Sequence, residues 1–463
     1  MVGIGALALV GGGGFLAFAH RPAIEAIEPP APTSFASETV RRGEELAVLA
    51  NCNTCHSAPG GAPYAGGLPI ETPFGTIHAT NITPDPETGI GRWSEAAFER
   101  SMREGVDRDG NHLYPAFPYD HFTRVSSDDI AAIYGYLMTR EPARAEPPAN
   151  ELPFPLDQRP LLAGWKLLFL EREPLAPDPA RSAEWNRGRE LTEGLGHCGA
   201  CHTPRNVLGA TQRDQALAGA ELADWYAYAL NGSSPAPVPW TVDSLTFYLR
   251  HGYHEEHGVS RGTMALVTAN LGASSEADVR AMATYIVEEM GEPSPERMQR
   301  AEAARELAAR ENRAGAPTAG DSMAASGTPA EGGRGAAIFA AACASCHESG
   351  RALPEGGLNL HLSTALRSTN PQNVVNVTLH GLPAPEDQAG PVMPGFAGAI
   401  GEADLVALLA YARARFGAGE APWDDLEARV RDTLSGERSP ASYRSDGTQA
   451  APSTNETRTT PWH

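Results

Sequence analysis

The sequence predicts an all-α fold of three tandem domains, joined by Pro-rich and Gly/Ala-rich linkers. Two observations lead to this prediction. One short cysteine motif occurs three times at nearly equal intervals, and one helical pattern closes each interval. The length of 463 residues agrees with this number, because a domain usually holds about 100–200 residues.

The motif is the pentad Cys-x-x-Cys-His, and its copies use all six cysteines of the chain. This spacing is the attachment signal of c-type haem, in which two thiols bond to the porphyrin and the histidine binds the iron. Zinc sites and redox pairs also use Cys-x-x-Cys, but three pentads that consume every cysteine favour haem. We therefore predict three covalently attached haem c groups. The attaching thiols are Cys52, Cys55, Cys198, Cys201, Cys343 and Cys346, and the proximal iron ligands are His56, His202 and His347.

Each domain is expected to begin with an Arg-Gly pair in a short helix before its pentad. These pairs are Arg42-Gly43, Arg187-Gly188 and Arg334-Gly335. Each domain is expected to close with a helix in which Ala follows Asp by three residues and Tyr follows it by seven. The closing helices contain Asp129, Ala132 and Tyr136, then Asp278, Ala281 and Tyr285, then Asp404, Ala407 and Tyr411. Apolar residues around these positions form one helical stripe, and the Asp suits the positive N-terminus of the helix.

This repeat places cytochrome-sized domains at residues 35–140, 181–291 and 330–417. The remaining segments are predicted to be an N-terminal segment at 1–34, linkers at 141–180 and 292–329, and a largely disordered polar tail at 418–463. The first linker is Pro-rich and contains an apolar helix, which either packs between domains or docks onto a subunit or a lipid. The second linker is an exposed charged helix followed by a flexible Gly/Ala-rich stretch.

Residues 1–19 carry no charged side chain and are just long enough to cross a bilayer. A secretory signal would have a similar apolar run, but no small-residue cleavage site stands out before Arg21, so an uncleaved anchor is favoured. No basic residue precedes the run, and we expect the encoded start to lie upstream. Because thioether attachment of haem takes place outside the cytoplasm, the chain is expected on the periplasmic side of the bacterial inner membrane.

The second axial ligand decides what each haem does, because a strong ligand makes an electron carrier whereas an open iron binds small molecules. A helix-ending glycine, at Gly105, Gly252 or Gly381, precedes a candidate position by twelve residues in each domain. In domains two and three that position holds Met264 and Met393, and we predict that both bind iron.

Domain one has Phe117 at this position, and phenylalanine cannot bind iron. His121 lies four residues further on, and we predict it as the sixth ligand of haem 1. His112, Met102, Met138 and a five-coordinate haem are the alternatives. A separate group, formed by His251, His254 and His257, could bind a metal, but a solvated loop or a contact with a haem propionate is favoured.

The chain resembles the membrane-anchored three-haem cytochrome c subunits of periplasmic bacterial dehydrogenases. The resemblance covers about residues 35–417 and rests on the pentads and on four segments. These are Thr72-Pro73-Phe74-Gly75-Thr76, Thr80-Asn81-Ile82-Thr83-Pro84-Asp85, Leu113-Tyr114-Pro115-Ala116-Phe117-Pro118-Tyr119, and Gly196 to Asn206 around the second pentad. The resemblance implies class I-like cytochrome c domains. It also implies an electron conduit from a catalytic subunit to ubiquinone or a terminal oxidase.

Quinoprotein members of this group commonly have methionine where this chain has Phe117. The combination of Phe117 and His121 is more similar to cytochromes paired with molybdenum hydroxylases. The quinoprotein or flavoprotein alcohol and sugar dehydrogenases are the second group of candidates for the catalytic partner.

We therefore expect a non-catalytic electron-transfer subunit of an oxidoreductase complex. Its expected partners are a catalytic dehydrogenase subunit, a quinone or oxidase as electron acceptor, and the inner membrane through the N-terminal segment. The net charge of −21 argues against nucleic acid as a partner. The alternative is a haem enzyme of the peroxidase or thiosulfate-oxidising type, which would use an open or unusually ligated haem 1.

Overall fold

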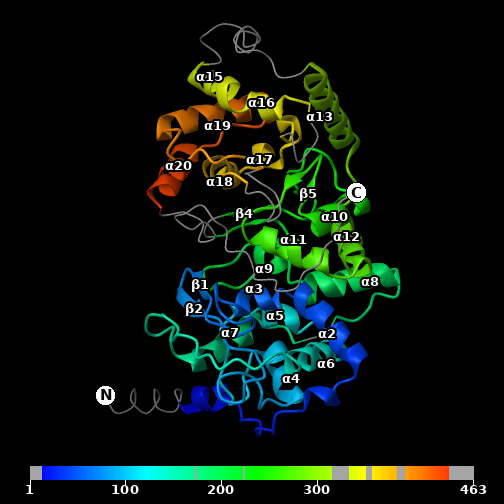
Figure 1. Ribbon diagram of the computed structural model, residues 1–463, viewed down its shortest axis with the longest axis vertical. Helices are drawn as coiled ribbons and strands as arrows, with labels where there is room; N and C mark the ends of the chain where they lie inside the picture. The colour runs from blue at the N-terminus through cyan, green and yellow to red at the C-terminus, as the bar shows by residue number, and fades with distance from the viewer. Residues whose placement is uncertain are drawn as a thin grey trace. The chain divides into compact units, whose positions relative to one another are not determined.

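The computed structural model describes residues 13–172, 175–222, 225–314, 333–350, 357–382 and 392–436. They belong to two compact units, one built mainly from residues 1–200 and 273–278, the other from residues 201–272 and 279–450. Helices dominate both units, as Figure 1 shows, which confirms the predicted all-α class. In the described part of the chain, the strands form three small two-stranded antiparallel sheets. The segment predicted as domain two contributes to both units.

The first unit contains the whole of predicted domain one and the first linker. Its longer helices are α2 (Ser37–Leu49), α4 (Glu95–Glu104), α6 (Ser127–Met138) and α7 (Leu162–Phe169). Its shorter elements are η1 (Pro32–Ser34), α3 (Cys52–His56), α5 (Tyr119–Phe122), η2 (Arg159–Leu161), α8 (Ala183–Arg189) and the π-helical η3 (Glu190–Leu195). Strands β1 (Pro69–Thr72) and β2 (Gly75–His78) form its hairpin.

The second unit begins within α9 (Gly199–His202) and continues through two groups of helices. The first group is η4 (Arg213–Gln215), α10 (Val242–His251), α11 (Thr263–Ala273), α12 (Glu276–Met290) and α13 (Pro295–Ala314). The last residue of α11 and the first turn of α12, up to Asp278, belong to the first unit. The second group is α15 (Gly333–Ala342), α16 (Ala344–His347), η5 (Leu360–Leu362), α17 (Thr364–Arg367), α18 (Gln372–His380), α19 (Glu402–Phe416) and α20 (Leu426–Ser435). Two strand pairs accompany them, β3 (Ala220–Glu221) with β4 (Tyr226–Ala227), and β5 (Tyr253–His254) with β6 (Gly258–Val259).

A glycine lets two helices cross closely at each end of the chain. A Cβ atom on Gly43 of α2 would lie 1.9 Å from the carbonyl oxygen of Ala132 in α6. A Cβ atom on Gly335 of α15 would lie 2.1 Å from the carbonyl oxygen of Ala407 in α19. Any side chain larger than hydrogen would therefore push these helices apart. At both crossings, the Gly of the Arg-Gly pair therefore contacts the Ala of the closing-helix pattern.

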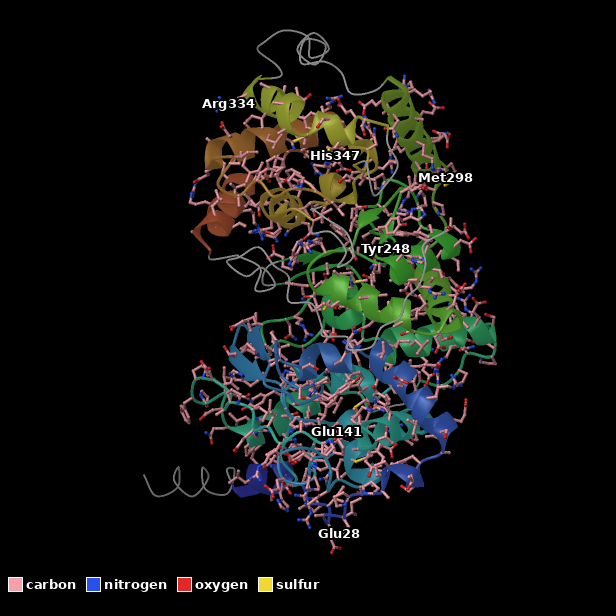
Figure 2. The ribbon with its side chains drawn as sticks, viewed as in Figure 1. Glu28, Glu141, Tyr248, Met298, Arg334 and His347 are labelled. Carbon is pink, nitrogen blue, oxygen red and sulfur yellow. The ribbon has the colours of Figure 1, made fainter. Side chains whose placement is uncertain are left out.

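The arginine of each Arg-Gly pair binds an aspartate at the start of a closing helix. Nη1 of Arg42 lies 2.9 Å from Asp278, and Nη1 of Arg187 lies 2.9 Å from Asp129. Arg187 also contacts Asp278 through Nε at 3.1 Å. Burial opposes the charge on Asp278, but the two guanidinium groups outweigh it and hold the pKa of this carboxyl below its usual value. The same pairing joins Arg334, labelled in Figure 2, to Asp404.

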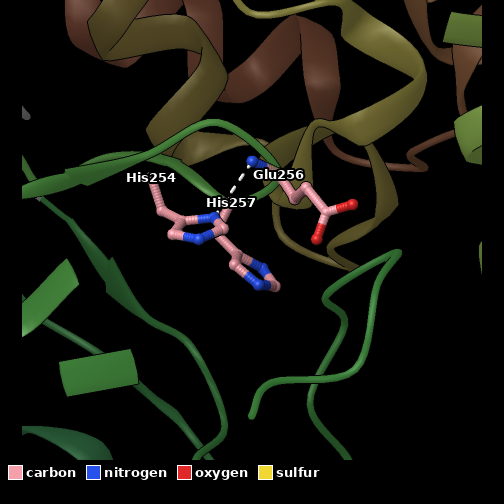
Figure 3. Close-up of side chains that lie close together, drawn as sticks. All are labelled: His254, Glu256 and His257. Atoms are coloured by element: carbon pink, nitrogen blue, oxygen red, sulfur yellow. Dashed lines mark hydrogen bonds between the residues drawn. The ribbon is translucent and has the colours of Figure 1, made fainter. Parts of the chain in front are cut away.

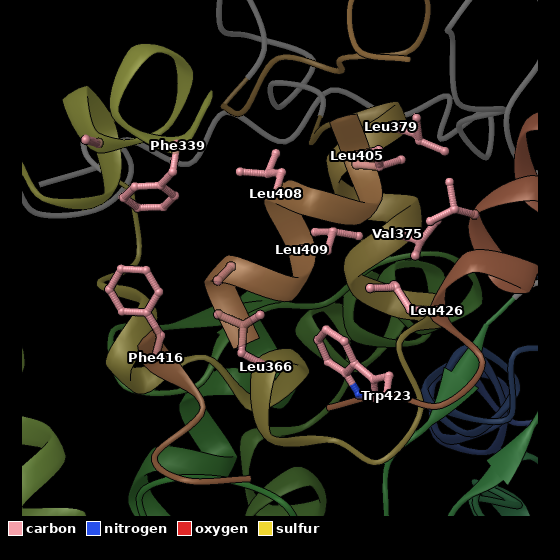
Figure 4. Packing of buried hydrophobic residues seen from close by; sticks show 13 residues of the cluster. Phe339, Leu366, Val375, Leu379, Leu405, Leu408, Leu409, Phe416, Trp423 and Leu426 are labelled. Atoms are coloured by element: carbon pink, nitrogen blue, oxygen red, sulfur yellow. The ribbon is translucent and has the colours of Figure 1, made fainter. Parts of the chain in front are cut away.

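The C-terminal part of the second unit has a core that reaches beyond the predicted third domain. Phe339 of α15 and Leu409 of α19 lie in one buried cluster with Trp423, Leu426 and Val430 (Figure 4). The prediction of a largely disordered tail from residue 418 is therefore wrong up to residue 436, because these apolar side chains fold α20 onto the core. Residues 437–463 lie outside the described residues.

The remaining predicted segments are described in part. Helix α13 lies where the sequence predicts an exposed charged helix, but its face formed by Ala301, Ala304 and Ala308 is buried. The flexible stretch predicted after α13, residues 315–332, lies outside the described residues. Residues 13–19 of the predicted anchor are helical, and residues 1–12 are not described. Across the described ranges, no helix combines the length and apolarity that crossing a membrane requires.

Replacing Gly43 by Ala is expected to lower the free energy of unfolding by about 1–3 kcal/mol, the usual cost of overpacking. The added methyl group would meet the Ala132 carbonyl, whereas Gly164→Ala in α7 meets only the Phe15 ring, 3.8 Å away. The control substitution should change stability by less than about 1 kcal/mol, and with a favourable sign. Calorimetric unfolding of both variants tests this, and equal destabilisation would contradict the crossing-contact explanation.

Candidate haem-binding sites

Each pentad folds into a short helix that presents its cysteines on one side. Helices α3, α9 and α16 each end at the pentad histidine, and the thiols of each pentad are three residues apart, about one helical turn. All six thiols are free of disulfide bonds. The pentads therefore offer the donor set that covalent attachment of haem requires.

The three pentad histidines share one hydrogen-bonding arrangement. Nδ1 of His56 lies 2.6 Å from the backbone carbonyl oxygen of Thr80, and Nδ1 of His202 lies 2.6 Å from that of Tyr228. Nδ1 of His347, labelled in Figure 2, lies 2.7 Å from the carbonyl of Leu358. Because Nδ1–H donates its hydrogen bond to the carbonyl, the lone pair of the neutral ring is on Nε2, the atom that would bind iron. Burial lowers the pKa of each ring, which favours this neutral form.

The segment from Thr80 to Asp85 holds the carbonyl that orients His56. Asn81 is buried, and its side-chain NH₂ group donates to the carbonyl of Ala143 at 2.7 Å. Its side-chain oxygen accepts from the backbone N–H of Thr83 at 2.9 Å. Asp85 accepts from the backbone N–H of Thr88 at 2.7 Å. These bonds explain why the polar side chains of Asn81, Thr83 and Asp85 are buried, a role that the sequence alone did not reveal.

The three helix-ending glycines lie where the sequence predicts them. Gly105, Gly252 and Gly381 follow α4, α10 and α18, each with a positive φ between 60° and 74°. Beyond Gly381, the backbone of Met393 pairs with Leu382 through hydrogen bonds of 2.8 and 3.2 Å. Met264 is the second residue of α11. Both methionines are half-buried, and their binding to iron stays a prediction.

In domain one, aromatic packing occupies the position of the methionine. The ring of Phe117 lies 5.4 Å from that of Phe122 and 6.5 Å from that of Tyr119. His121 in α5 is 8% exposed, and its Nδ1 lies 2.9 Å from the backbone carbonyl oxygen of Glu193. This is the arrangement of the pentad histidines, and it is compatible with metal binding through Nε2.

His112, the second histidine candidate for haem 1, uses both ring nitrogens within the fold. Its Nε2 donates to the Ala19 carbonyl at 2.8 Å, and its Nδ1 lies 3.0 Å from Nζ of Lys166. Binding iron would break one of these buried hydrogen bonds, which disfavours His112 as a ligand. The two methionine candidates, Met102 and Met138, are core residues of α4 and α6.

Lys166 of α7 is the single lysine of the chain, and it is buried in the first unit. Besides His112, its ammonium group contacts the carbonyl oxygen of Gly105 at 2.5 Å. It also lies 4.7 Å from the centre of the Tyr119 ring. Lys166 therefore connects α7 to the segment between α4 and α5 that carries Phe117.

Of the three histidines before Met264, His254 and His257 form a compact cluster with Glu256, shown in Figure 3. Nδ1 of His254 accepts from the Glu256 backbone N–H at 3.1 Å, and Arg305 binds the Glu256 carboxylate. His257 is buried, stacks on Trp240 at 3.4 Å, and has no hydrogen-bond partner at either ring nitrogen among the described residues. The solvated-loop interpretation is therefore wrong for His257. His254 and Glu256 already take part in these contacts, with the Glu256 backbone and with Arg305, which disfavours a metal site.

Two family models match the chain. The model described as cytochrome c matches residues 40–141, and the model described as cytochrome c oxidase, cbb3-type, subunit III matches residues 330–411. These matches enclose the first and third pentads. The second pentad lies between them.

Curated relatives cover most of this chain. A nicotinate dehydrogenase subunit of Pseudomonas putida is 42% identical over 89% of this chain, which spans only 33% of that protein. The fructose dehydrogenase cytochrome subunit of Gluconobacter japonicus is 34% identical, over 79% of this chain and 76% of its own length. The gluconate 2-dehydrogenase cytochrome c subunit of Pantoea cypripedii is 31% identical, over 82% and 86% respectively.

Lys166 is expected to make stability depend on pH in the alkaline range. Burial, reinforced by Arg172 and Arg21, lowers the pKa of its ammonium group to about 7, whereas an unfolded lysine titrates near 10.4. Between these values the unfolded chain binds more protons, so stability should rise with pH and level off above the unfolded pKa. Unfolding of wild type and Lys166→Met, compared at several pH values, isolates this slope. If the difference in stability between wild type and Lys166→Met did not change with pH, the lowered pKa of Lys166 would be contradicted.

Proposed function

Because this chain belongs to the family of cytochrome c subunits of bacterial dehydrogenases, we propose that it is the electron-transfer subunit of a dehydrogenase complex. It accepts electrons from a catalytic subunit and passes them to a quinone or a terminal oxidase. The observation that carries this proposal is the shared geometry of His56, His202 and His347. Each ring is held by a backbone carbonyl in the orientation that an axial haem ligand needs.

The proposed number of haems is three, one for each pentad, in three tandem class I-like domains. Family models match around the first and third pentads only. Support for the second comes from His202, whose Nδ1–carbonyl distance of 2.6 Å equals that of His56. Cys198 and Cys201, which form no disulfide bond, complete the same donor set.

The bound haem groups supply the one-electron chemistry, and the protein supplies their attachment, axial ligands and burial. The six pentad cysteines attach the porphyrins, and the pentad histidines are the proximal ligands. Met264 and Met393 are the proposed distal ligands in domains two and three. A methionine ligand raises the potential of a haem relative to a second histidine, so the haem of domain one would be the lowest in potential if His121 binds it.

For the catalytic partner we favour a molybdenum hydroxylase, with quinoprotein or flavoprotein alcohol and sugar dehydrogenases as the second candidate. The combination of Phe117 and His121 supports this choice. Among the relatives described above, identity is higher to the nicotinate dehydrogenase subunit, at 42%, than to the fructose and gluconate dehydrogenase subunits, at 34% and 31%. The proposed location is the periplasmic side of the inner membrane, with residues 1–19 as an anchor.

His121→Ala is expected to convert one haem of the loaded protein to a high-spin form, because that iron would lose its sixth ligand. His112→Asn is the matched control, since both ring nitrogens of His112 are engaged within the fold. Absorption and electron paramagnetic resonance spectra of both variants measure the change. Unaltered spectra for His121→Ala, or the loss of a low-spin haem only in His112→Asn, would reject His121 as the ligand.

Purification of the complex from native membranes tests the function. We expect a catalytic subunit to remain bound and its substrate to reduce all three haems. Cofactor analysis of that subunit separates the classes: molybdopterin with iron–sulfur clusters supports the favoured partner, while pyrroloquinoline quinone or flavin supports the second candidate. An isolated chain that binds carbon monoxide at haem 1 and turns over peroxide or thiosulfate would overturn the electron-carrier function.

A further inference from the structure

Half of the exposed large apolar side chains that the structure describes fall on two segments of the first unit that touch each other at Phe15 and Gly164. Among the described residues, seven of the fourteen large hydrophobic side chains that are exposed lie on two segments, residues 13–19 and 154–168. They are Leu16, Phe18, Phe154, Leu156, Leu161, Leu167 and Leu168. We call this group the α7 face. Monomeric soluble proteins rarely leave a gathering of this kind uncovered.

Helix α7 buries its charged side chain and exposes its apolar ones, the reverse of a surface helix in a soluble protein. Lys166, its charged residue, is 3% exposed and points into the first unit, whereas Leu167 and Leu168 are 70% and 69% exposed. A surface helix in water normally places such residues the other way round. Contacts of the Lys166 ammonium group with the Gly105 carbonyl oxygen and with His112 hold the helix in this orientation. The contacts of Lys166 therefore fix Leu167 and Leu168 on the outer side of α7.

The N-terminal apolar segment is continuous with this face. The ring of Phe15 packs against Gly164 of α7, 3.8 Å from the position of a Cβ atom. Residues 13–19 are helical and expose Leu16 and Phe18 beside it. The whole run of residues 1–19 carries no charge. The last part of a segment with the composition of a membrane anchor thus packs beside α7.

From these observations we infer that the α7 face lies on a lipid bilayer, with α7 in the plane of the membrane surface. Eight residues of helix measure about 12 Å, far too short to cross the hydrocarbon core of about 30 Å. A helix of this kind instead buries its apolar side by about 5–10 Å at the boundary between headgroups and acyl chains. Leu161, Leu167 and Leu168 would enter the bilayer, while Lys166 stays in the protein.

Lipid is the occupant that fits the surroundings of the face. The charged residues that flank these segments in the sequence have both signs, Arg21 and Arg172 against Asp157 and Glu171. No single charge sign is therefore available to direct a charged protein partner or to require anionic lipid. Apolar contact should hold the face, so high salt should leave the contact intact, and uncharged phosphatidylcholine should suffice.

Hydrogen–deuterium exchange of the haem-loaded full chain, with and without phosphatidylcholine vesicles, tests this inference. The readout is local because residues 1–19 could hold the chain on vesicles without any help from α7. We expect the amides of residues 161–170 to exchange several-fold more slowly on vesicles, at low and at high salt. Unchanged exchange of α7 in a chain that is demonstrably vesicle-bound would overturn the inference.

The variant Leu167→Ser/Leu168→Ser should abolish the vesicle-dependent protection of residues 161–170. Its matched control is Val207→Ser/Leu208→Ser, another adjacent exposed pair, at 91% and 52% exposure, which should retain the protection. Both variants change exposed side chains, and their haem spectra confirm that they fold. Slower exchange of α7 on addition of the catalytic subunit in lipid-free solution, but not on vesicles, would instead make the face a protein interface.

Discussion

The close crossing of two helices is the constraint on which each end of this molecule depends. At each end, the helix that precedes the pentad crosses the closing helix, α2 over α6 and α15 over α19. Glycine at Gly43 and Gly335 lets the backbones touch, since a Cβ atom at either position would collide with a carbonyl oxygen. Arg42 and Arg334, one residue earlier, then bind aspartates of closing helices. One dipeptide thus sets both the distance between the helices and an ionic contact at the crossing.

The second recurring device is the backbone carbonyl that receives Nδ1 of each pentad histidine. The three carbonyls come from residues 24, 26 and 11 positions beyond the histidine, in loops with different sequences. A carbonyl is available from any residue type, so loops that differ in sequence can perform the same task. His121 uses the carbonyl of Glu193 in a comparable way. The ring of His121 is therefore held in the same way as the rings of the pentad histidines. This holds even though the aromatic segment around Phe117 differs in sequence from the segments around Met264 and Met393.

The sequence predicted the fold class, the pentads and the helix-ending glycines, because each depends on local chemistry or on a short repeat. It did not reveal that the repeated Gly meets the repeated Ala, or that the repeated Arg binds an Asp, since these contacts join residues about 60 to 240 positions apart. The C-terminal boundary was placed too early because a short helix such as α20 has a weak pattern of its own. Its stability comes from packing of Leu426 and Val430 on the core. The burial of His257 likewise depends on Trp240, seventeen residues away.

The location of Lys166 also decides which chemistry the surface of this protein offers. All but one of the 36 basic side chains are arginine, and the exception lies inside the fold. Guanidinium groups keep their proton throughout the physiological and alkaline range, so the positive charges of the surface are permanent. Amine-directed labels and cross-linkers would find no side chain to modify on the folded molecule. Neighbours of this protein are better captured through its many carboxylates or its arginines.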